Sequence, residues 1–136
     1  MNKEINIVYT EDDQELRGIN ELLFPDLIES HQPIRIHTGA NSSDLITLVS
    51  KHNPDLVITD NDMPVINDGI NTLKELRKMG CNVPAILTSG RIIEGDEKLE
   101  SDMSSIGNAV YLVKDYTNEK IRAEIFKLWN MQLADR

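Results

Sequence analysis

Acidic side chains cluster at two places in the sequence, each directly after a short apolar segment. The first group is Glu11, Asp12 and Asp13, and the second is Asp60 and Asp62. Crowded carboxylates repel one another, and a hard cation such as Mg²⁺ relieves that repulsion, usually with one or two carboxylates, waters and phosphate oxygens. A carboxylate can also act as a nucleophile and form an aspartyl phosphate. The two groups therefore indicate metal-assisted phosphoryl chemistry, provided that the fold brings them together.

Two further polar groups follow apolar segments in the second half of the chain. Thr88 and Ser89 precede Gly90 after one segment, and Lys114 precedes Asp115 after the next. A hydroxyl and a lysine beside a bound cation suit a phosphoryl group, because both can hydrogen-bond its oxygens. All four polar groups are therefore of the types that metal-assisted phosphoryl chemistry needs.

Each group also has a simpler interpretation when it is taken alone. The acids of residues 11–13 could cap a helix and complement its dipole. Asp60 and Asp62 stand before Pro64 and could belong to a turn, and Lys114 could be a solvated surface lysine. The functional interpretation depends on the joint placement of the groups at the ends of apolar segments.

Five apolar segments of strand length alternate with segments of helical periodicity. The apolar segments are residues 5–10, 34–37, 56–59, 85–88 and 109–113. Several are continuously apolar, as expected for strands that are covered on both faces. The alternation predicts an α/β fold, a five-stranded parallel sheet with helices on both faces. Ligands of such sheets bind beyond the carboxyl ends of the strands, which is where the polar groups lie.

The helical segments carry their own start and stop signals. An N-cap for the second helix is offered by Asn41, Ser42 and Ser43, and Gly80 and Gly107 can end the third and fourth helices. Pro25 is expected to bend or interrupt the first helix. The last helix is expected to start near Thr117.

Composition narrows the class of protein. The 136 residues carry 14 Lys and Arg against 23 Asp and Glu, a formal net charge of −9 with a pI near 4.7. This balance argues against nucleic acid or an anionic membrane as a partner. One cysteine, Cys81, excludes an internal disulfide, and no apolar run is long enough to span a membrane. We expect a single cytoplasmic domain over residues 1–136.

With these motifs in order, the sequence resembles the receiver domain of response regulators in two-component signal transduction, the CheY-like superfamily. The stretch DLVITDNDMP at residues 55–64 looks like the family's third strand, phospho-acceptor aspartate and Met-Pro. The acids of residues 11–13, the stretch PAILTS at residues 84–89 and YLVK at residues 111–114 resemble its other motifs. The resemblance covers nearly the whole chain and implies a flavodoxin-like (βα)5 fold with strand order 2-1-3-4-5.

The resemblance also implies a role for each acidic residue at the site. Asp60 would accept a phosphoryl group from a sensor histidine kinase or phosphotransfer protein. Asp12 would bind Mg²⁺ directly and Glu11 through water, and Asp60 and the backbone carbonyl of Asp62 would complete the metal site. The protein would be no enzyme beyond its own phosphorylation and dephosphorylation.

Three further residues would read out the phosphoryl group. Lys114 would pair with a phosphoryl oxygen, Thr88 would hydrogen-bond the group, and Tyr111 would move inward with Thr88. This movement would remodel the face made by the fourth helix, the fifth strand and the fifth helix, a two-state element biased by a local charge. A downstream protein target would bind there, and a homodimer could form through the same face.

The sequence departs from the family pattern near the site. Asp115 stands where the family usually has Pro, so the reach of Lys114 is open, and Gly69 comes one residue late. Asp62 adds a negative side chain that we expect to change the lifetime of the phosphoryl group. Few residues follow the fifth helix, which favours a stand-alone receiver or a fragment of a longer protein.

Two alternatives remain at this point. A degenerate receiver would bind partners without phosphorylation. A haloacid dehalogenase-like phosphatase would use Asp60 as nucleophile and Asp62 as general acid–base. In that family, however, the Asp-x-Asp strand generally comes first, and here it is the third apolar segment.

Overall fold

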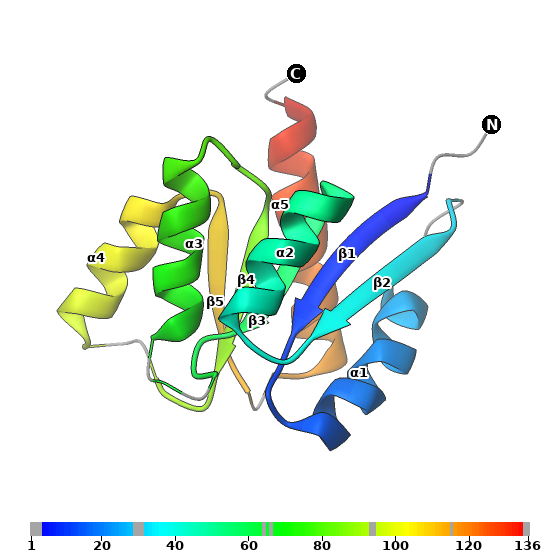
Figure 1. The fold of residues 1–136 in the computed structure, drawn as a ribbon, viewed down its shortest axis with the longest axis horizontal. Helices are drawn as coiled ribbons and strands as arrows, with labels where there is room; N and C mark the ends of the chain where they lie inside the picture. The colour runs from blue at the N-terminus through cyan, green and yellow to red at the C-terminus, as the bar shows by residue number, and fades with distance from the viewer. Residues whose placement is uncertain are drawn as a thin grey trace.

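The structure is a computed structural model that describes residues 4–28, 32–63, 65, 67–92, 95–114 and 116–134, without the side chains of residues 129–134. Strands and helices alternate along the chain: β1 (Ile5–Thr10), α1 (Gln14–Leu27), β2 (Ile34–Gly39), α2 (Ser42–His52), β3 (Leu56–Asp60), α3 (Asp68–Lys78), β4 (Ala85–Ser89), α4 (Glu97–Ile106), β5 (Ala109–Val113) and α5 (Asn118–Ala134). The five strands form one parallel sheet in the order β2-β1-β3-β4-β5 (Figure 1). The predicted fold class and strand order are confirmed.

The sheet separates two apolar cores. Successive side chains of a strand point to opposite faces, so Ile58 and Ile86 pack with α1 and α5, whereas Val57 and Leu87 pack with α2, α3 and α4. All residues of β3 and β4 are buried, which explains why these segments are continuously apolar in sequence. In Figure 1, α2 and α3 lie in front of the sheet and α5 behind it. Among the described residues, no helix is both long and apolar enough to cross a membrane.

Helix α1 runs through Pro25 without interruption, so the expected break at this residue is absent. The proline stands two residues before the helix end, where it removes one intrahelical hydrogen bond and its ring crowds the carbonyl four residues earlier. Packing outweighs that loss, because Phe24 and Leu27 are buried and the Phe24 ring packs edge-on to Tyr9 with centroids 5.0 Å apart. Edge-to-face aromatic pairs are favourable beyond their buried area.

Gly69 lets the start of α3 approach the end of β3. A Cβ at this position would lie 2.5 Å from the carbonyl oxygen of Asp60 and 2.9 Å from Cα of Asn61. The amide of Gly69 also donates a hydrogen bond to the carbonyl of Asn61 over 3.0 Å, which ties the start of α3 to the residue after β3. The glycine therefore fixes the backbone that carries Asp60.

We predict that Gly69→Ala destabilises the fold by about 1–3 kcal/mol, since a methyl group must displace backbone atoms. Urea unfolding measures this change. Gly18→Ala is the matched control, because its Cβ would meet nothing within 4 Å and the exchange in an exposed helix should stabilise by about 0.5–1 kcal/mol. Equal effects of the two substitutions would contradict the close approach.

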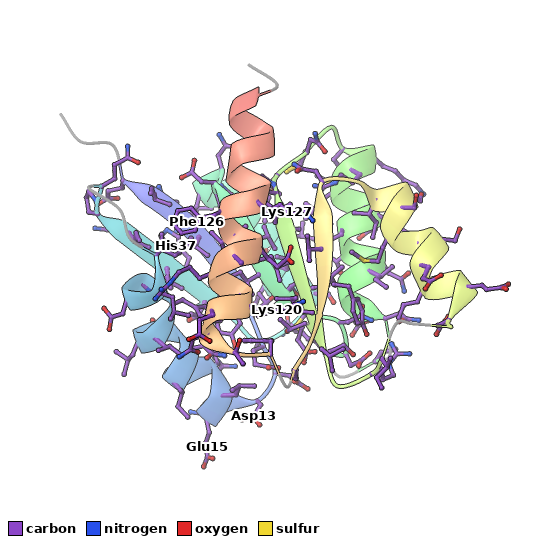
Figure 2. All side chains as sticks on the ribbon, turned by 180° about the vertical axis from the view of Figure 1, so that it is seen from behind. Asp13, Glu15, His37, Lys120, Phe126 and Lys127 are labelled. Carbon is purple, nitrogen blue, oxygen red and sulfur yellow. The ribbon has the colours of Figure 1, made fainter. Side chains whose placement is uncertain are left out.

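His37 on β2 and His52 at the end of α2 stack with ring centroids 3.5 Å apart and an interplanar angle of 12°. Nε2 of His37 also lies 2.9 Å from Oδ1 of Asn6. Figure 2 labels His37 on the strand beside β1. Burial lowers the pKa of His37 below its ordinary value, and the neighbouring His52 and Arg35 lower it further. No local sequence pattern predicts this pair, because its members are 15 residues apart on different elements.

We predict that an NMR titration gives His37 a pKa below 6.5 and that His52→Gln raises it. Because the folded state binds this proton less tightly than the unfolded chain, the free energy of unfolding should fall as pH drops through about 6.5. The loss should level off below the folded-state pKa. A His37 pKa that does not respond to His52→Gln would contradict the coupling of the two rings.

Candidate functional site

Three carboxylates meet at the carboxyl edge of the sheet. Oxygens of Glu11, Asp12 and Asp60 all lie within 4.8 Å of one another. Glu11 and Asp60 are 1% and 2% exposed, whereas Asp12 is exposed. The two acidic groups of the sequence are therefore brought together because β1 and β3 are neighbours in the sheet.

Asp13, the third acid of the first group, has a different role. Its side chain accepts hydrogen bonds from the amides of Glu15 and Leu16 over 3.0 and 3.1 Å, and so caps α1. Figure 2 shows Asp13 and Glu15 at this end of α1. The simple capping interpretation thus holds for Asp13, whereas Glu11 and Asp12 belong to the acidic cluster.

Lys114 reaches the cluster from the end of β5. Its Nζ lies 3.2 Å from Oδ2 of Asp60 and 3.0 Å from Oε1 of Glu11. The Lys114 amide donates to the carbonyl of Ser89 over 2.7 Å, which extends the pairing of β5 with β4. The lysine therefore reaches the site without the family's proline after it. Asp115 itself, like Pro64, lies outside the described residues.

The charges of the cluster do not balance. Burial, reinforced by the Asp60 carboxyl beside it, raises the pKa of Glu11 to about 8. Burial alone would lower the pKa of Lys114, but its contacts with Glu11 and Asp60 outweigh that effect and raise it. One ammonium thus faces three crowded carboxyl groups, an arrangement that a divalent cation would relieve.

A backbone amide orients the Asp60 carboxylate, and the buried side chain of Asn61 ties the following residue to α3. Oδ1 of Asp60 accepts from the amide of Asp62 over 3.2 Å, and Oδ2 faces Lys114. Asn61 is fully buried, and its Oδ1 accepts from the amide of Ile70 over 3.0 Å. The phosphorylation candidate therefore sits on a rigid link between β3 and α3, and sequence reasoning missed the role of Asn61.

The Asp62 carboxylate belongs to a second polar network that the sequence did not indicate. Its Oδ1 accepts from a guanidinium nitrogen of Arg91 over 3.2 Å, and its Oδ2 accepts from the Ser89 hydroxyl over 3.2 Å. The same Arg91 nitrogen donates to Oδ1 of Asn67 over 2.6 Å. Arg91 thus bridges the loops after β3 and β4, beside the acidic cluster.

The strand register places the side chains of Thr88 and Ser89 on opposite faces of the sheet. Thr88 was expected to move together with Tyr111, but β4 and β5 pair Thr88 with Leu112 and Leu87 with Tyr111. By strand alternation Thr88 lies on the face of α1 and α5, whereas Ser89 lies on the face of Tyr111. Thr88 instead lines a cavity of about 150 Å³ formed by Tyr9, Glu11, Leu16, Asn20, Thr88, Lys114 and Tyr116.

Tyr111 is half-buried against the core beneath α4. Its hydroxyl donates to the backbone carbonyl of Arg91 over 3.0 Å. The Tyr111 side chain therefore lies against the loop after β4 that carries Arg91.

Comparison with known proteins identifies the same family that the sequence motifs resemble. Residues 7–126 match the response regulator receiver domain family. The chain is 31% identical over 126 residues to the probable C4-dicarboxylate response regulator DctR of Bacillus subtilis, covering 92% of this chain and 52% of that protein. It is 32% identical over 88 residues to a protein-glutamate methylesterase/protein-glutamine glutaminase of Clostridium acetobutylicum, covering 64% of this chain and 24% of that protein. The chain thus spans about half or less of these relatives.

Solved structures share the fold at lower identity. A Francisella response regulator receiver domain has a TM-score of 0.76 at 23% identity, over 94% of this chain and 98% of that one. The chemotaxis response regulator CheY4 of Vibrio cholerae has a TM-score of 0.74 at 18% identity, over 93% and 99% of the two chains. Since the family match spans residues 7–126 and the strand order is that of the family, this chain belongs to the response regulator receiver domains of two-component signal transduction.

Proposed function

We propose that the chain is a receiver that takes a phosphoryl group onto Asp60 from a histidine kinase or phosphotransfer protein. The observation that carries this proposal is the convergence of Lys114, Glu11 and Asp12 on the Asp60 carboxylate. Glu11 and Asp12 have no part in the phosphatase alternative, and the family match removes its remaining support. A receiver that binds partners without phosphorylation is the other outcome of the tests below.

In the proposed reaction a carboxylate oxygen of Asp60 attacks the phosphorus, and the phosphorus–nitrogen bond of the donor phosphohistidine breaks. The histidine nitrogen leaves with the bond's electron pair. Lys114, now 3.2 Å from Oδ2, follows the negative charge to a phosphoryl oxygen. The amide of Asp62 keeps Oδ1 in place, so the carboxylate is oriented before the donor arrives.

The same residues fit a Mg²⁺ ion. Asp12 is the solvent-facing carboxylate and would bind the ion directly, with Asp60 and the Asp62 carbonyl, while the buried Glu11 would act through water. Bound Mg²⁺ would offset the negative charge that gathers on the phosphoryl oxygens. The donor set consists of oxygens, which is what this cation prefers.

The readout of the phosphoryl group is assigned in the proposal to Ser89 rather than Thr88. Ser89 lies on the same face of the sheet as Tyr111. Its hydroxyl contacts Asp62, which stands two residues after Asp60 in the loop that follows β3. A shift of its hydroxyl toward the phosphoryl group would move the backbone under which the Tyr111 ring lies. The change would then spread to the α4-β5-α5 face.

Output would pass through protein contact at that face, to a downstream target or as a homodimer. The net charge of −9 supports a protein partner over nucleic acid or an anionic membrane. Cytoplasmic location belongs to the same proposal. The single-domain, stand-alone organisation and the effect of Asp62 on the lifetime of the phosphoryl group stay predictions.

We predict one phosphoryl adduct by intact mass when the protein is incubated with acetyl phosphate and Mg²⁺. Asp60→Asn should take none, because the amide is a poor nucleophile, and EDTA should remove the adduct from the wild type. Asp13→Asn, which alters the helix cap but no residue of the site, is the matched control and should be modified like the wild type. An unmodified wild type, with phosphoramidate as well, would favour the phosphorylation-independent module.

A second prediction separates the two hydroxyls. Ser89→Ala should still take the phosphoryl group but should lose the accompanying displacement of the Tyr111 ring signals in NMR spectra. A hydrogen bond to a charged acceptor contributes about 1.5–3 kcal/mol, so the active population should fall about tenfold or more. Thr88→Val should leave the displacement intact. The reverse pattern would restore the role first expected of Thr88.

A further inference from the structure

We propose that the cavity lined by Thr88 and Lys114 is a site for ordered water, and that Thr88 acts through this water as a positioning residue for Lys114. This inference rests on the proposed function and adds a positioning element to the same site. The cavity has a volume of about 150 Å³, and α1 forms part of its wall. β3 and β4 pair Asp60 with Thr88, so the cavity begins one strand away from the phosphorylation candidate.

The buried Thr88 hydroxyl is the first sign of a bound molecule. Thr88 is 4% exposed, and none of the described residues hydrogen-bonds its side chain, although its carbonyl accepts from the amide of Asn61 over 2.8 Å. A buried polar group without a partner costs free energy, so buried hydroxyls are normally paired with protein or with ordered water. Because Thr88 lines the cavity, a water there supplies the missing partner.

Two more buried polar side chains line the same cavity. Nδ2 of Asn20 donates to the Tyr9 hydroxyl over 2.8 Å, and the two residues are 6% and 2% exposed. The Tyr9 hydroxyl accepts in this bond and so keeps its own proton to donate, while the amide oxygen of Asn20 can accept. Donors and acceptors thus reach the cavity from β1, α1 and β4. A buried water needs two to four such partners.

The size of the cavity also suits water. A water molecule takes up about 30 Å³ in the liquid, so a cavity of about 150 Å³ has room for several molecules. An apolar molecule would fit by volume alone. Cavities that stay dry are lined by apolar side chains, however, whereas this one has buried hydroxyl and amide groups in its wall.

Lys114 is the group through which the water acts on the reaction. Its ammonium has three protons. Contacts with Oδ2 of Asp60 and Oε1 of Glu11 use two of them, and Lys114 also lines the cavity. Water in the cavity accepts the third proton and restricts the flexible lysine side chain to positions close to Asp60. The ammonium is then already oriented when the phosphoryl group arrives.

The first test compares crystal structures of wild type and Thr88→Val, without phosphodonor, at a resolution that shows ordered water. We expect water that links Thr88 Oγ1 to Lys114 Nζ in the wild type. Valine has nearly the shape of threonine but no hydroxyl, so the linking water should be lost from the variant while the cavity keeps its form. A wild-type cavity without ordered water, or with water that does not reach Lys114, overturns the proposal.

The second test measures the rate of phosphorylation by acetyl phosphate with Mg²⁺. Thr88→Val should lower the rate about three- to tenfold, the effect of losing one neutral hydrogen bond that orients Lys114. Thr88→Ser keeps the hydroxyl and should stay within about twofold of the wild type. A purely structural role of the threonine would not be rescued by serine in this way.

Thr72→Val is the matched control for the rate. Thr72 is also 4% exposed, but its hydroxyl donates to the carbonyl of Asp68 within α3, on the other face of the sheet. Its loss should leave the rate within about twofold of the wild type, because the site is independent of the cavity. A rate for Thr88→Val equal to that of Thr72→Val overturns the positioning role.

A double substitution tests whether Thr88 and Tyr9 act through the same water. Tyr9→Phe removes the second hydroxyl but keeps the ring that packs on Phe24, and it should also lower the rate. Tyr9→Phe combined with Thr88→Val should lose less than the product of the two single effects, since both hydroxyls hold one water cluster. Single effects that simply multiply would contradict the shared site.

The two proposals fail in different ways. If wild type is modified on Asp60 but Thr88→Val reacts as fast as Thr72→Val, the positioning role is overturned and the proposed function stands. If wild type takes no phosphoryl group, the proposed function fails. The two crystal structures then decide the water site alone: a link from Thr88 to Lys114 that Thr88→Val lacks supports it, and the absence of that link in wild type overturns it.

Discussion

The ion contacts of Lys114 with Asp60 and Glu11 are the interactions on which the rest of the site depends. Two carboxylates that are 1% and 2% exposed would be costly to bury without a cation, and Lys114 supplies one from the opposite end of the sequence. β1, β3 and β5 must therefore end at the same edge of one parallel sheet. The β2-β1-β3-β4-β5 order meets this requirement, and Gly69 allows α3 to close beneath Asp60.

Lys114 compensates the negative charge of the cluster only in part, and the remaining negative charge suits the proposed binding of a cation. One ammonium stands among three crowded carboxyl groups, and this crowding, together with burial, raises the pKa of Glu11, so the site attracts a cation. Nearby, Asp62 is balanced separately by Arg91, so its charge does not add fully to the cluster. The site thus combines a carboxylate oriented by the Asp62 amide, a backbone tied to α3 through Asn61, and an adjacent polar network around Asp62.

The fold could be predicted from the hydrophobic periodicity of the sequence. The acidic cluster could be predicted because its residues directly follow the apolar segments that form neighbouring strands. Thr88 and Ser89 could not be separated in this way. The predicted strand ended at Thr88, whereas β4 runs to Ser89, and which face a residue takes depends on its register with β5. Arg91 and Asn61 were missed for a related reason. Their partners lie on other loops, and no local pattern marks an arginine that binds an aspartate 29 residues earlier.

The central claim is that Asp60 accepts a phosphoryl group whose charge is met by Lys114 and a cation on Asp12. A crystal structure of the protein with Mg²⁺ and beryllofluoride tests it most directly. The account predicts beryllofluoride bonded to a carboxylate oxygen of Asp60, Lys114 Nζ on a fluorine, Mg²⁺ on Asp12, and the Ser89 hydroxyl moved from Asp62 to another fluorine. A structure in which Lys114 still bridges Glu11 and Asp60, with neither ion bound at the cluster, would contradict it.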